Sequence, residues 1–272
     1  MELQRLEKSD VLYRHWPAPQ TKAVLLLVHG LGAHSARWNF FADYFAARGF
    51  TCYALELKGF GQTPDRPRGH INSFATYLQD LRQLRQAAEQ AHPGKKIYLI
   101  GESLGALIAF QAAAREPAGL AGLVLMSPAF ANAMKFSLVD YLTLPFFFVI
   151  DPRHQYKMPF TAAMCTRDLA YRQVMDNNPD EYRYASAKLL INTLFAQINA
   201  AARAKQFRLP VLMQVSGQDA MISTPAAKRT FGQLATADKK LIEYPAMSHA
   251  LYIDLEREKV YADLLAWLEP RL

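Results

Sequence analysis

The strongest constraint on the fold is a Gly-x-Ser-x-Gly motif that stands between a short apolar run and an alanine-rich stretch. The run at residues 97–100 is typical of a buried strand, and the motif itself contains Gly101, Ser103 and Gly105. A strand that turns sharply into a helix holds its serine in a strained conformation, and flanking glycines let the strand and the helix pass closely. The pattern predicts a nucleophile elbow, with the Ser103 hydroxyl above a helix N-terminus that favours negative charge.

Apolar, β-rich runs alternate with longer amphipathic stretches along the chain. This alternation is typical of a mostly parallel sheet flanked by crossover helices. The expected strands are 23–28, 50–55, 97–100, 120–126, 211–215 and 240–244, and the expected helices include 35–48, 73–92 and 256–268. The sequence therefore predicts an α/β fold with an eight-stranded type of sheet.

Residues 128–209 interrupt this alternation. The interval is rich in aromatics and prolines and becomes helical from about residue 168 to 205, and it is too long for a loop within a compact sheet. We expect an inserted, mainly helical cap on a core made of residues 1–127 and 210–272. Its apolar side chains Phe146, Phe147, Phe148 and Met158 are candidates for lining a substrate site, while ordinary packing within the cap explains the three phenylalanines equally well.

A serine nucleophile needs a base, and the base needs a carboxylate to orient it. Asp219 comes shortly after the expected strand 211–215, and His249 lies in the loop after the expected strand 240–244. The carboxyl ends of parallel strands share one edge of a sheet, so both residues should lie near Ser103. Taken one at a time, each residue has an ordinary structural explanation, with Asp219 as a turn residue and His249 as a loop histidine. Their order in the chain predicts a Ser103–His249–Asp219 triad.

Two backbone N–H groups are the expected donors of an oxyanion hole. One belongs to Leu104, directly after the serine. The other belongs to the loop after strand 23–28, where Leu31 stands between two glycines that free the backbone to turn. A simple tight turn would use the same glycines.

The chain resembles the α/β-hydrolase serine esterases of the monoacylglycerol lipase and lysophospholipase group. The resemblance covers most of the chain and is carried by residues 27–38, 59–61, 68–74, 101–105, 217–219 and 248–249, with 166–179 similar to the cap. It implies the same triad and the same oxyanion donors. Glu102 and Ala106 depart from the histidine and glycine usual there, and residues 56–59 read Glu-Leu-Lys-Gly where Asp-x-Arg-Gly is usual.

These features predict a serine carboxylic-ester hydrolase for a hydrophobic monoester, such as a monoacylglycerol or a lysophospholipid. A thioesterase, amidase or carbon–carbon bond hydrolase would share every motif named, and a non-catalytic binding protein on the same scaffold would usually lose a triad member. Epoxide hydrolase and dehalogenase chemistry is disfavoured, because those enzymes carry aspartate at the position of Ser103. The mechanism requires no metal and no organic cofactor.

Charge and hydropathy restrict the partners and the compartment. No run of about 18 apolar residues occurs, and residues 1–8 carry charges where a signal peptide is apolar. We therefore expect a cytoplasmic protein. The net charge of +7 is spread along the chain without a basic block, which disfavours nucleic-acid binding. It favours loose peripheral contact with anionic lipid, although a generally basic, solvated surface explains it as well. The oligomeric state is not indicated.

Overall fold

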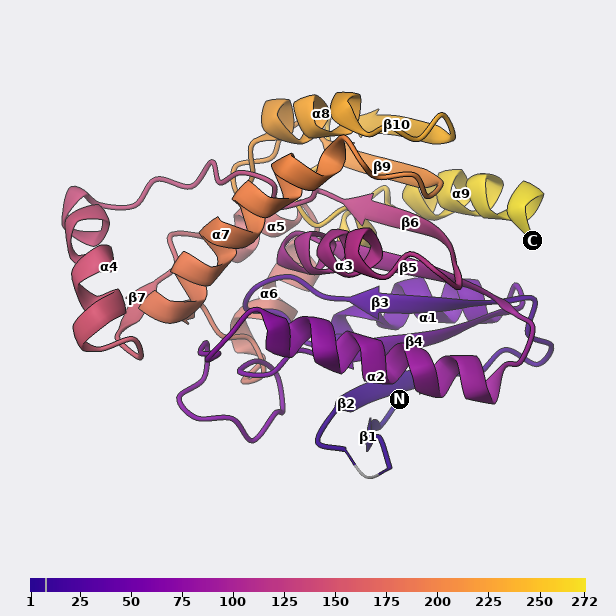
Figure 1. Cartoon of the computed structure of the whole chain (residues 1–272), viewed down its shortest axis with the longest axis horizontal. Coiled ribbons are helices and arrows are strands. Elements are labelled where there is room, and N and C mark those ends of the chain that lie inside the picture. Colours follow the sequence, from indigo (N-terminus) through magenta and orange to yellow (C-terminus); the bar gives the residue numbers. More distant parts are fainter. Residues whose placement is uncertain (8) are drawn as a thin grey trace.

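The computed structural model describes residues 1–7 and 9–272, and its centre is a twisted eight-stranded sheet (Figure 1). The strand order is β1-β2-β4-β3-β5-β6-β9-β10. The strands are β1 (Leu3–Arg5), β2 (Leu12–Trp16), β3 (Ala23–Val28), β4 (Phe50–Glu56), β5 (Lys96–Glu102), β6 (Leu120–Met126), β9 (Val211–Ser216) and β10 (Lys239–Tyr244). All pairs from β4 to β10 are parallel, whereas β1 and β2 add to the edge in antiparallel fashion. The predicted mostly parallel sheet is confirmed.

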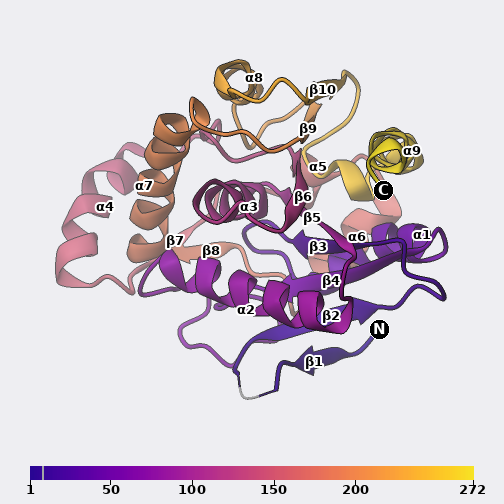
Figure 2. The ribbon, with the colours of Figure 1, turned by 45° about the vertical axis from the view of Figure 1, so that its right-hand side comes forward.

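Helices cover both faces of this sheet (Figures 1 and 2). The helices α2 (Ala75–Ala91) and α3 (Leu104–Arg115) lie on one face, and α1 (Asn39–Ala46) and α9 (Arg257–Leu268) lie on the other. Every residue of β3 and β4 is buried, as expected for parallel strands that are packed on two sides. A short 3-10 helix, η1 (Ser35–Trp38), precedes α1, and α8 (Thr224–Gln233) lies between β9 and β10 in the chain.

Residues 128–209 form an excursion at the end of the sheet where the parallel strands finish (Figure 1). It contains α4 (Leu138–Ile150), α5 (Ala162–Cys165), α6 (Leu169–Asn177) and α7 (Ala187–Ala204), together with a small antiparallel pair, β7 (Gln155–Lys157) and β8 (Tyr184–Ser186). The run that holds the three phenylalanines is part of α4, with Pro145 inside the helix. We propose that 128–209 is a cap on a core of 1–127 and 210–272.

No helix among residues 1–7 and 9–272 has both the length and the apolar character needed to span a bilayer.

Candidate active site

Ser103 lies in the sharp turn between β5 and α3. Its backbone has φ 55° and ψ −119°, a conformation that side-chain-bearing residues rarely adopt. A Cβ added at Gly101 would come within 2.3 Å of the Gly105 carbonyl oxygen, and one at Gly105 would come within 2.1 Å of the Val28 carbonyl oxygen. Helix, turn and strand can therefore approach this closely only because both positions are glycine. The turn leaves the Ser103 side chain on the wall of a cavity.

His249 and Asp219 meet at the same edge of the sheet. Asp219 follows β9, and His249 lies between β10 and the 3-10 helix η2 (Leu251–Ile253). His249 Nδ1 donates to Asp219 Oδ2 over 2.7 Å, while Asp219 Oδ1 accepts from the backbone N–H groups of Met221 and Ile222, each over 2.9 Å. The carboxylate is thus held on both oxygens, and its position fixes the imidazole ring.

The electrostatics of this pair favour a charged Asp219. Burial alone raises the pKa of Asp219, but the His249 ring and two backbone N–H donors outweigh burial and lower it. Burial alone lowers the pKa of His249, and the carboxylates of Asp219 and Glu102 outweigh burial and raise it well above its ordinary value. Because Asp219 holds the proton on Nδ1, His249 Nε2 is the nitrogen left to exchange a proton.

Glu102 also belongs to this site. In the sequence it was notable only as a departure from the histidine that is usual before the serine. Its Oε1 lies 3.3 Å from His249 Nε2, and the side chains of both residues are almost fully buried. Among the described residues, His249 Nε2 has no hydrogen-bond partner, so its contact with Glu102 is a close charge contact and not an aligned hydrogen bond. The signal available in the sequence was the position of Glu102 next to Ser103, which did not reveal where its carboxylate turns.

Leu31 and Leu104 both lie on the cavity wall beside Ser103. Leu104 is the first residue of α3, so its backbone N–H belongs to the helix turn that has no intrahelical partner. Leu31 lies in the loop after β3, and this loop is braced by His29, whose Nδ1 donates to the Gly30 carbonyl oxygen over 2.9 Å while Nε2 accepts from the Leu57 N–H over 3.1 Å. Both ring nitrogens of His29 are occupied, so this side chain braces the loop and has no free nitrogen to act as a base.

The cavity at Ser103 has a volume of about 460 Å³ and walls that are mostly apolar. Residues 128–209 supply much of the wall, including Met134, Phe136, Leu144, Met158 and Leu190. Of the candidates for substrate contact, Met158 is therefore on the wall. Phe146, Phe147 and Phe148 are not among the lining residues: Phe146 is exposed, Phe147 stacks on His154, and Phe148 lies under the Lys188 ammonium.

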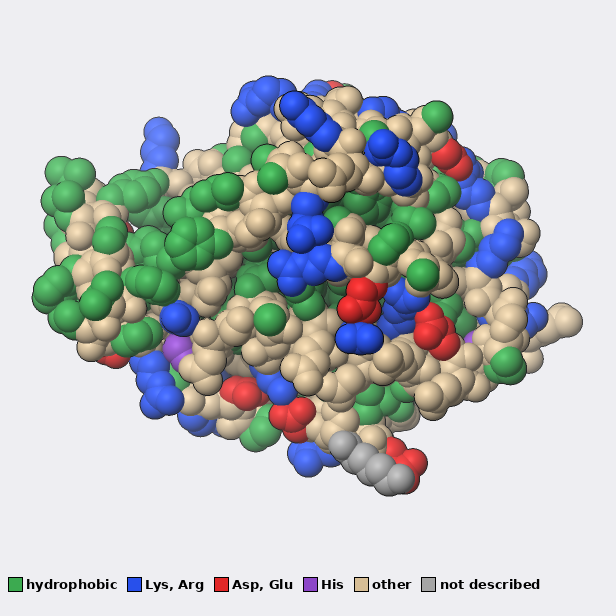
Figure 3. All heavy atoms as spheres, viewed as in Figure 1, with side chains coloured by type: hydrophobic (Ala, Val, Ile, Leu, Met, Phe, Trp, Pro, Cys, Tyr) green, Lys and Arg blue, Asp and Glu red, His purple; other side chains and the backbone are tan. Residues whose placement is uncertain are grey.

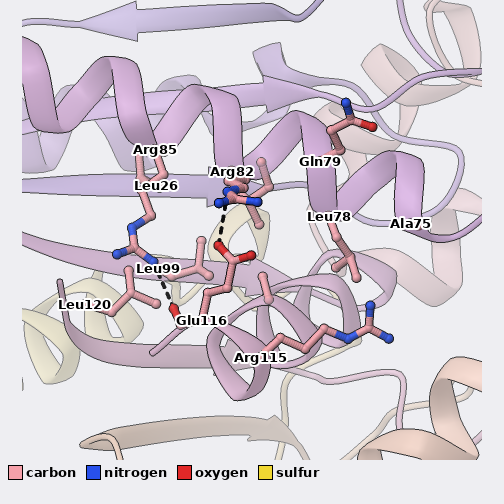
Figure 4. Close-up of a pocket in the computed structure, with 12 residues that line it drawn as sticks. Leu26, Ala75, Leu78, Gln79, Arg82, Arg85, Leu99, Arg115, Glu116 and Leu120 are labelled. Atoms are coloured by element: carbon pink, nitrogen blue, oxygen red, sulfur yellow. Dashed lines mark hydrogen bonds and ion pairs between the residues drawn. The ribbon is translucent and has the colours of Figure 1, made fainter. Parts of the chain in front are cut away.

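A second cavity, of about 340 Å³, lies between α2 and α3 (Figure 4). Arg82 and Arg85 on its rim are held by Glu116, through the carboxylate and the backbone carbonyl respectively. Arg115 and Glu116 are at the C-terminal end of α3, and Ser103 precedes its N-terminal end. Twelve residues of helix separate the two by about 18 Å, so this cavity is distinct from the Ser103 cavity.

In the part of the chain that the structure describes, no group of three or more His, Cys, Asp or Glu side chains is arranged so that it could hold a metal ion.

Known proteins are similar to this chain in sequence and in fold. The family model described as serine aminopeptidase, S33, matches residues 19–256. A monoacylglycerol lipase of Mycolicibacterium smegmatis is 25% identical over 96% of this chain and 94% of its own length. The phospholipase YtpA of Bacillus subtilis is 24% identical over 90% of this chain and 95% of its own. The crystal structure of Paleococcus ferrophilus monoacylglycerol lipase superimposes with a TM-score of 0.87 over the whole of both chains, at 24% identity.

The family match spans most of the chain, and the fold, the elbow and the strand order agree with it. The chain therefore belongs to the hydrolase family described as serine aminopeptidase, S33, and it is an α/β hydrolase similar to the monoacylglycerol lipases.

Proposed function

We propose that this protein is a serine carboxylic-ester hydrolase that acts on a hydrophobic monoester, such as a monoacylglycerol or a lysophospholipid. Ser103 is the nucleophile, His249 the general base and Asp219 the residue that orients it. Support comes from the hydrogen bond between His249 Nδ1 and Asp219 Oδ2 and from the strained turn that presents Ser103.

The proposed reaction proceeds through an acyl-enzyme. His249 Nε2 accepts the Ser103 hydroxyl proton as Oγ attacks the ester carbonyl carbon, and the N–H groups of Leu31 and Leu104 stabilise the oxyanion. The imidazolium then protonates the departing alcohol oxygen. Water, deprotonated by the same nitrogen, attacks the acyl-enzyme and releases the carboxylic acid.

The observation that carries the substrate class is the apolar cavity at Ser103. A volume of about 460 Å³ is sufficient for an extended acyl chain, and its aliphatic walls offer little to a charged ligand. Buried methylenes each contribute about 0.8 kcal/mol, or about a fourfold gain in binding. The named relatives are a monoacylglycerol lipase and a phospholipase, and these names support an acyl ester of glycerol or of a phospholipid as the candidate substrate.

The description of the family as serine aminopeptidase favours a second candidate function, that of an aminopeptidase. Such an enzyme must bind a free α-ammonium group, which requires an available carboxylate. Asp140 is the acidic side chain among the described residues that line the cavity, and its Oδ2 accepts from the Ser137 backbone N–H over 3.0 Å and from the Ser137 hydroxyl over 2.7 Å. Because Asp140 is engaged in capping α4, the ester reading is preferred.

A substrate panel tests both candidates. We expect kcat/KM for p-nitrophenyl esters to rise with acyl length until the cavity is filled, with turnover of monoacylglycerol or lysophosphatidylcholine and none of aminoacyl p-nitroanilides. A fluorophosphonate should add once, to Ser103, and Ser103→Ala should remove the adduct while the exposed-serine control Ser73→Ala retains it. A profile that is flat with acyl length would contradict the hydrophobic-monoester class, and labelling of Ser103→Ala would contradict the nucleophile.

We further propose that α4 contacts a lipid surface. Leu138, Leu142 and Val149 are each at least 70% exposed, and this side of the molecule carries a broad apolar area (Figure 3). Exposed side chains on α7 extend it: Leu194, Phe195 and Ile198. The exposed cations Lys135 and Arg153 flank α4 in the chain and suit an anionic interface.

Vesicle sedimentation tests this contact. The double variant Leu142→Ser/Val149→Ser should bind anionic phospholipid vesicles about tenfold more weakly, with unchanged turnover of a short soluble ester. Leu255→Ser, which removes a leucine that is 59% exposed outside 128–209, is the control. Equal vesicle binding by the wild type and both variants would refute the proposal. Loss of a dimer in the α4 variant alone would also refute it, because the apolar side of α4 would then bind a second copy of the chain.

A further inference from the structure

The base of the proposed triad lies between two carboxylates. Asp219 Oδ2 is 2.7 Å from His249 Nδ1, and Glu102 Oε1 is 3.3 Å from Nε2. All three side chains are at most 3% exposed, so solvent screens these interactions little. The contact at Nε2 matters because that nitrogen must accept the Ser103 proton. Among the described residues, no hydrogen bond joins Ser103 Oγ to it.

The fold makes room for the Glu102 carboxylate. A Cβ added at Gly30 would come within 2.4 Å of Glu102 Oε2 and within 3.0 Å of the Ser103 Cβ. Any side chain at position 30 would therefore displace Glu102 or the serine. Because Gly30 belongs to the loop that carries Leu31, the space for this carboxylate lies between the oxyanion loop and the triad.

Cys165 of α5 and Tyr252 of η2 are neutral near pH 7, because burial raises the pKa of each. Asp254 accepts from the N–H of Ser248, next to His249, and its charge is paired with Arg167. The guanidinium of Arg37 is paired with Glu181 of the 128–209 segment through a bidentate contact. The charges that act directly on the His249 ring are thus the carboxylates of Asp219 and Glu102.

We propose that Glu102 is a positioning residue that holds His249 in a protonated resting form, and that catalysis begins only when Nε2 loses its proton and is released toward Ser103. This inference rests on the proposed function, since it takes His249 as the base. An opposite charge within about 4–6 Å typically raises a histidine pKa by about one unit or more. A base that starts out protonated is inactive, so the pH at which activity appears moves upward.

The test is the pH profile of kcat/KM for a soluble ester. The acid limb of the wild-type enzyme should titrate above the ordinary histidine value of about 6.5. Glu102→Gln keeps the shape but removes the charge, and its acid limb should lie about one pH unit lower. Well below both limbs, the variant should be about tenfold faster than the wild type, and on the alkaline plateau the two should agree within about threefold. Glu116→Gln, which removes an exposed carboxylate elsewhere, should leave the limb unmoved.

Two results would overturn the proposal: a wild-type limb at or below pH 6.5, or a Glu102→Gln limb that coincides with the wild type. A purely structural role would lower activity at every pH without moving the limb. The wild-type limb needs no variant, so a limb at or below pH 6.5 overturns the proposal even where Glu102→Gln does not fold. The rate of fluorophosphonate labelling against pH gives the same limb independently of any ester. Persistent labelling of Ser103→Ala would instead count against the proposed nucleophile.

Discussion

Two parts of the candidate site are built in opposite ways. On the core side, Ser103, Asp219 and His249 are positioned by strand ends and by hydrogen bonds. On the side of residues 128–209, aliphatic and aromatic side chains line the Ser103 cavity and form its apolar wall. The three polar residues tolerate little displacement because hydrogen bonds and proton transfer require set geometry, whereas the apolar wall gains from contact area alone. Chemistry and substrate selection should therefore respond to different substitutions.

The largest effect is expected at the proposed catalytic residues. His249→Ala should lower kcat by about 10³ or more with folding intact, because triad members act as a unit. Asp219→Asn should fall in the same range, since Glu102 contacts Nε2 and so cannot replace Asp219 at Nδ1. Circular dichroism and steady-state kinetics are the measurements. Near wild-type turnover in His249→Ala would show that the base lies elsewhere.

The next largest effect is expected where the core is joined to residues 128–209. Arg37 of η1 pairs with Glu181, and both side chains are buried. Arg37→Met leaves Glu181 unpaired, so the free energy of unfolding in urea should fall by about 3 kcal/mol or more. Arg37→Met/Glu181→Leu should recover part of this loss. Lys228→Met, which breaks the exposed pair with Glu243, should cost less than about 1 kcal/mol. Equal losses of unfolding free energy for the buried and the exposed pair would show that the Arg37–Glu181 pair does not stabilise the junction in particular.

A smaller and more selective effect is expected on the apolar wall. Met158→Ala enlarges the cavity, so the preference for long over short acyl chains should change by about tenfold while acetate-ester turnover stays near wild type. Phe147→Ala is the matched control, because Phe147 stacks on His154 outside the lining. Ratios of kcat/KM along an ester series measure both. A larger shift for Phe147→Ala would place the acyl chain outside this cavity.

Five of the six parallel strands were predictable because each is a mostly apolar run that is almost wholly buried, as in residues 23–28. The sixth, β10 at the edge of the sheet, is only partly buried. The edge strands β1 and β2 were not located, since one is three residues long and the other alternates in burial. The sequence predicted helix in 128–209 only from about residue 168 onward. The helix that contains Phe147 was not predicted, because Pro145 within an aromatic run is a weak helix signal.

The site was predictable where chain order constrains position. Ser103, Asp219 and His249 each follow a strand of one parallel sheet, so their strand ends must share an edge whatever the side chains do. In contrast, the sequence did not predict which side of α4 is exposed or where its three phenylalanines point, since their orientation depends on how the helix packs against α7.

The sequence by itself determined the strand-to-helix turn at Ser103, the order of the proposed triad residues and the parallel sheet, because these depend on glycine stereochemistry and on the periodicity of apolar residues. Only the tertiary structure decided that Glu102 turns toward His249 Nε2 and that Met158, and not Phe147, lies on the cavity wall. Such contacts join residues far apart in the chain. Their geometry depends on the packing of β5 against the loop after β10 and of 128–209 over the core, and no local pattern encodes it.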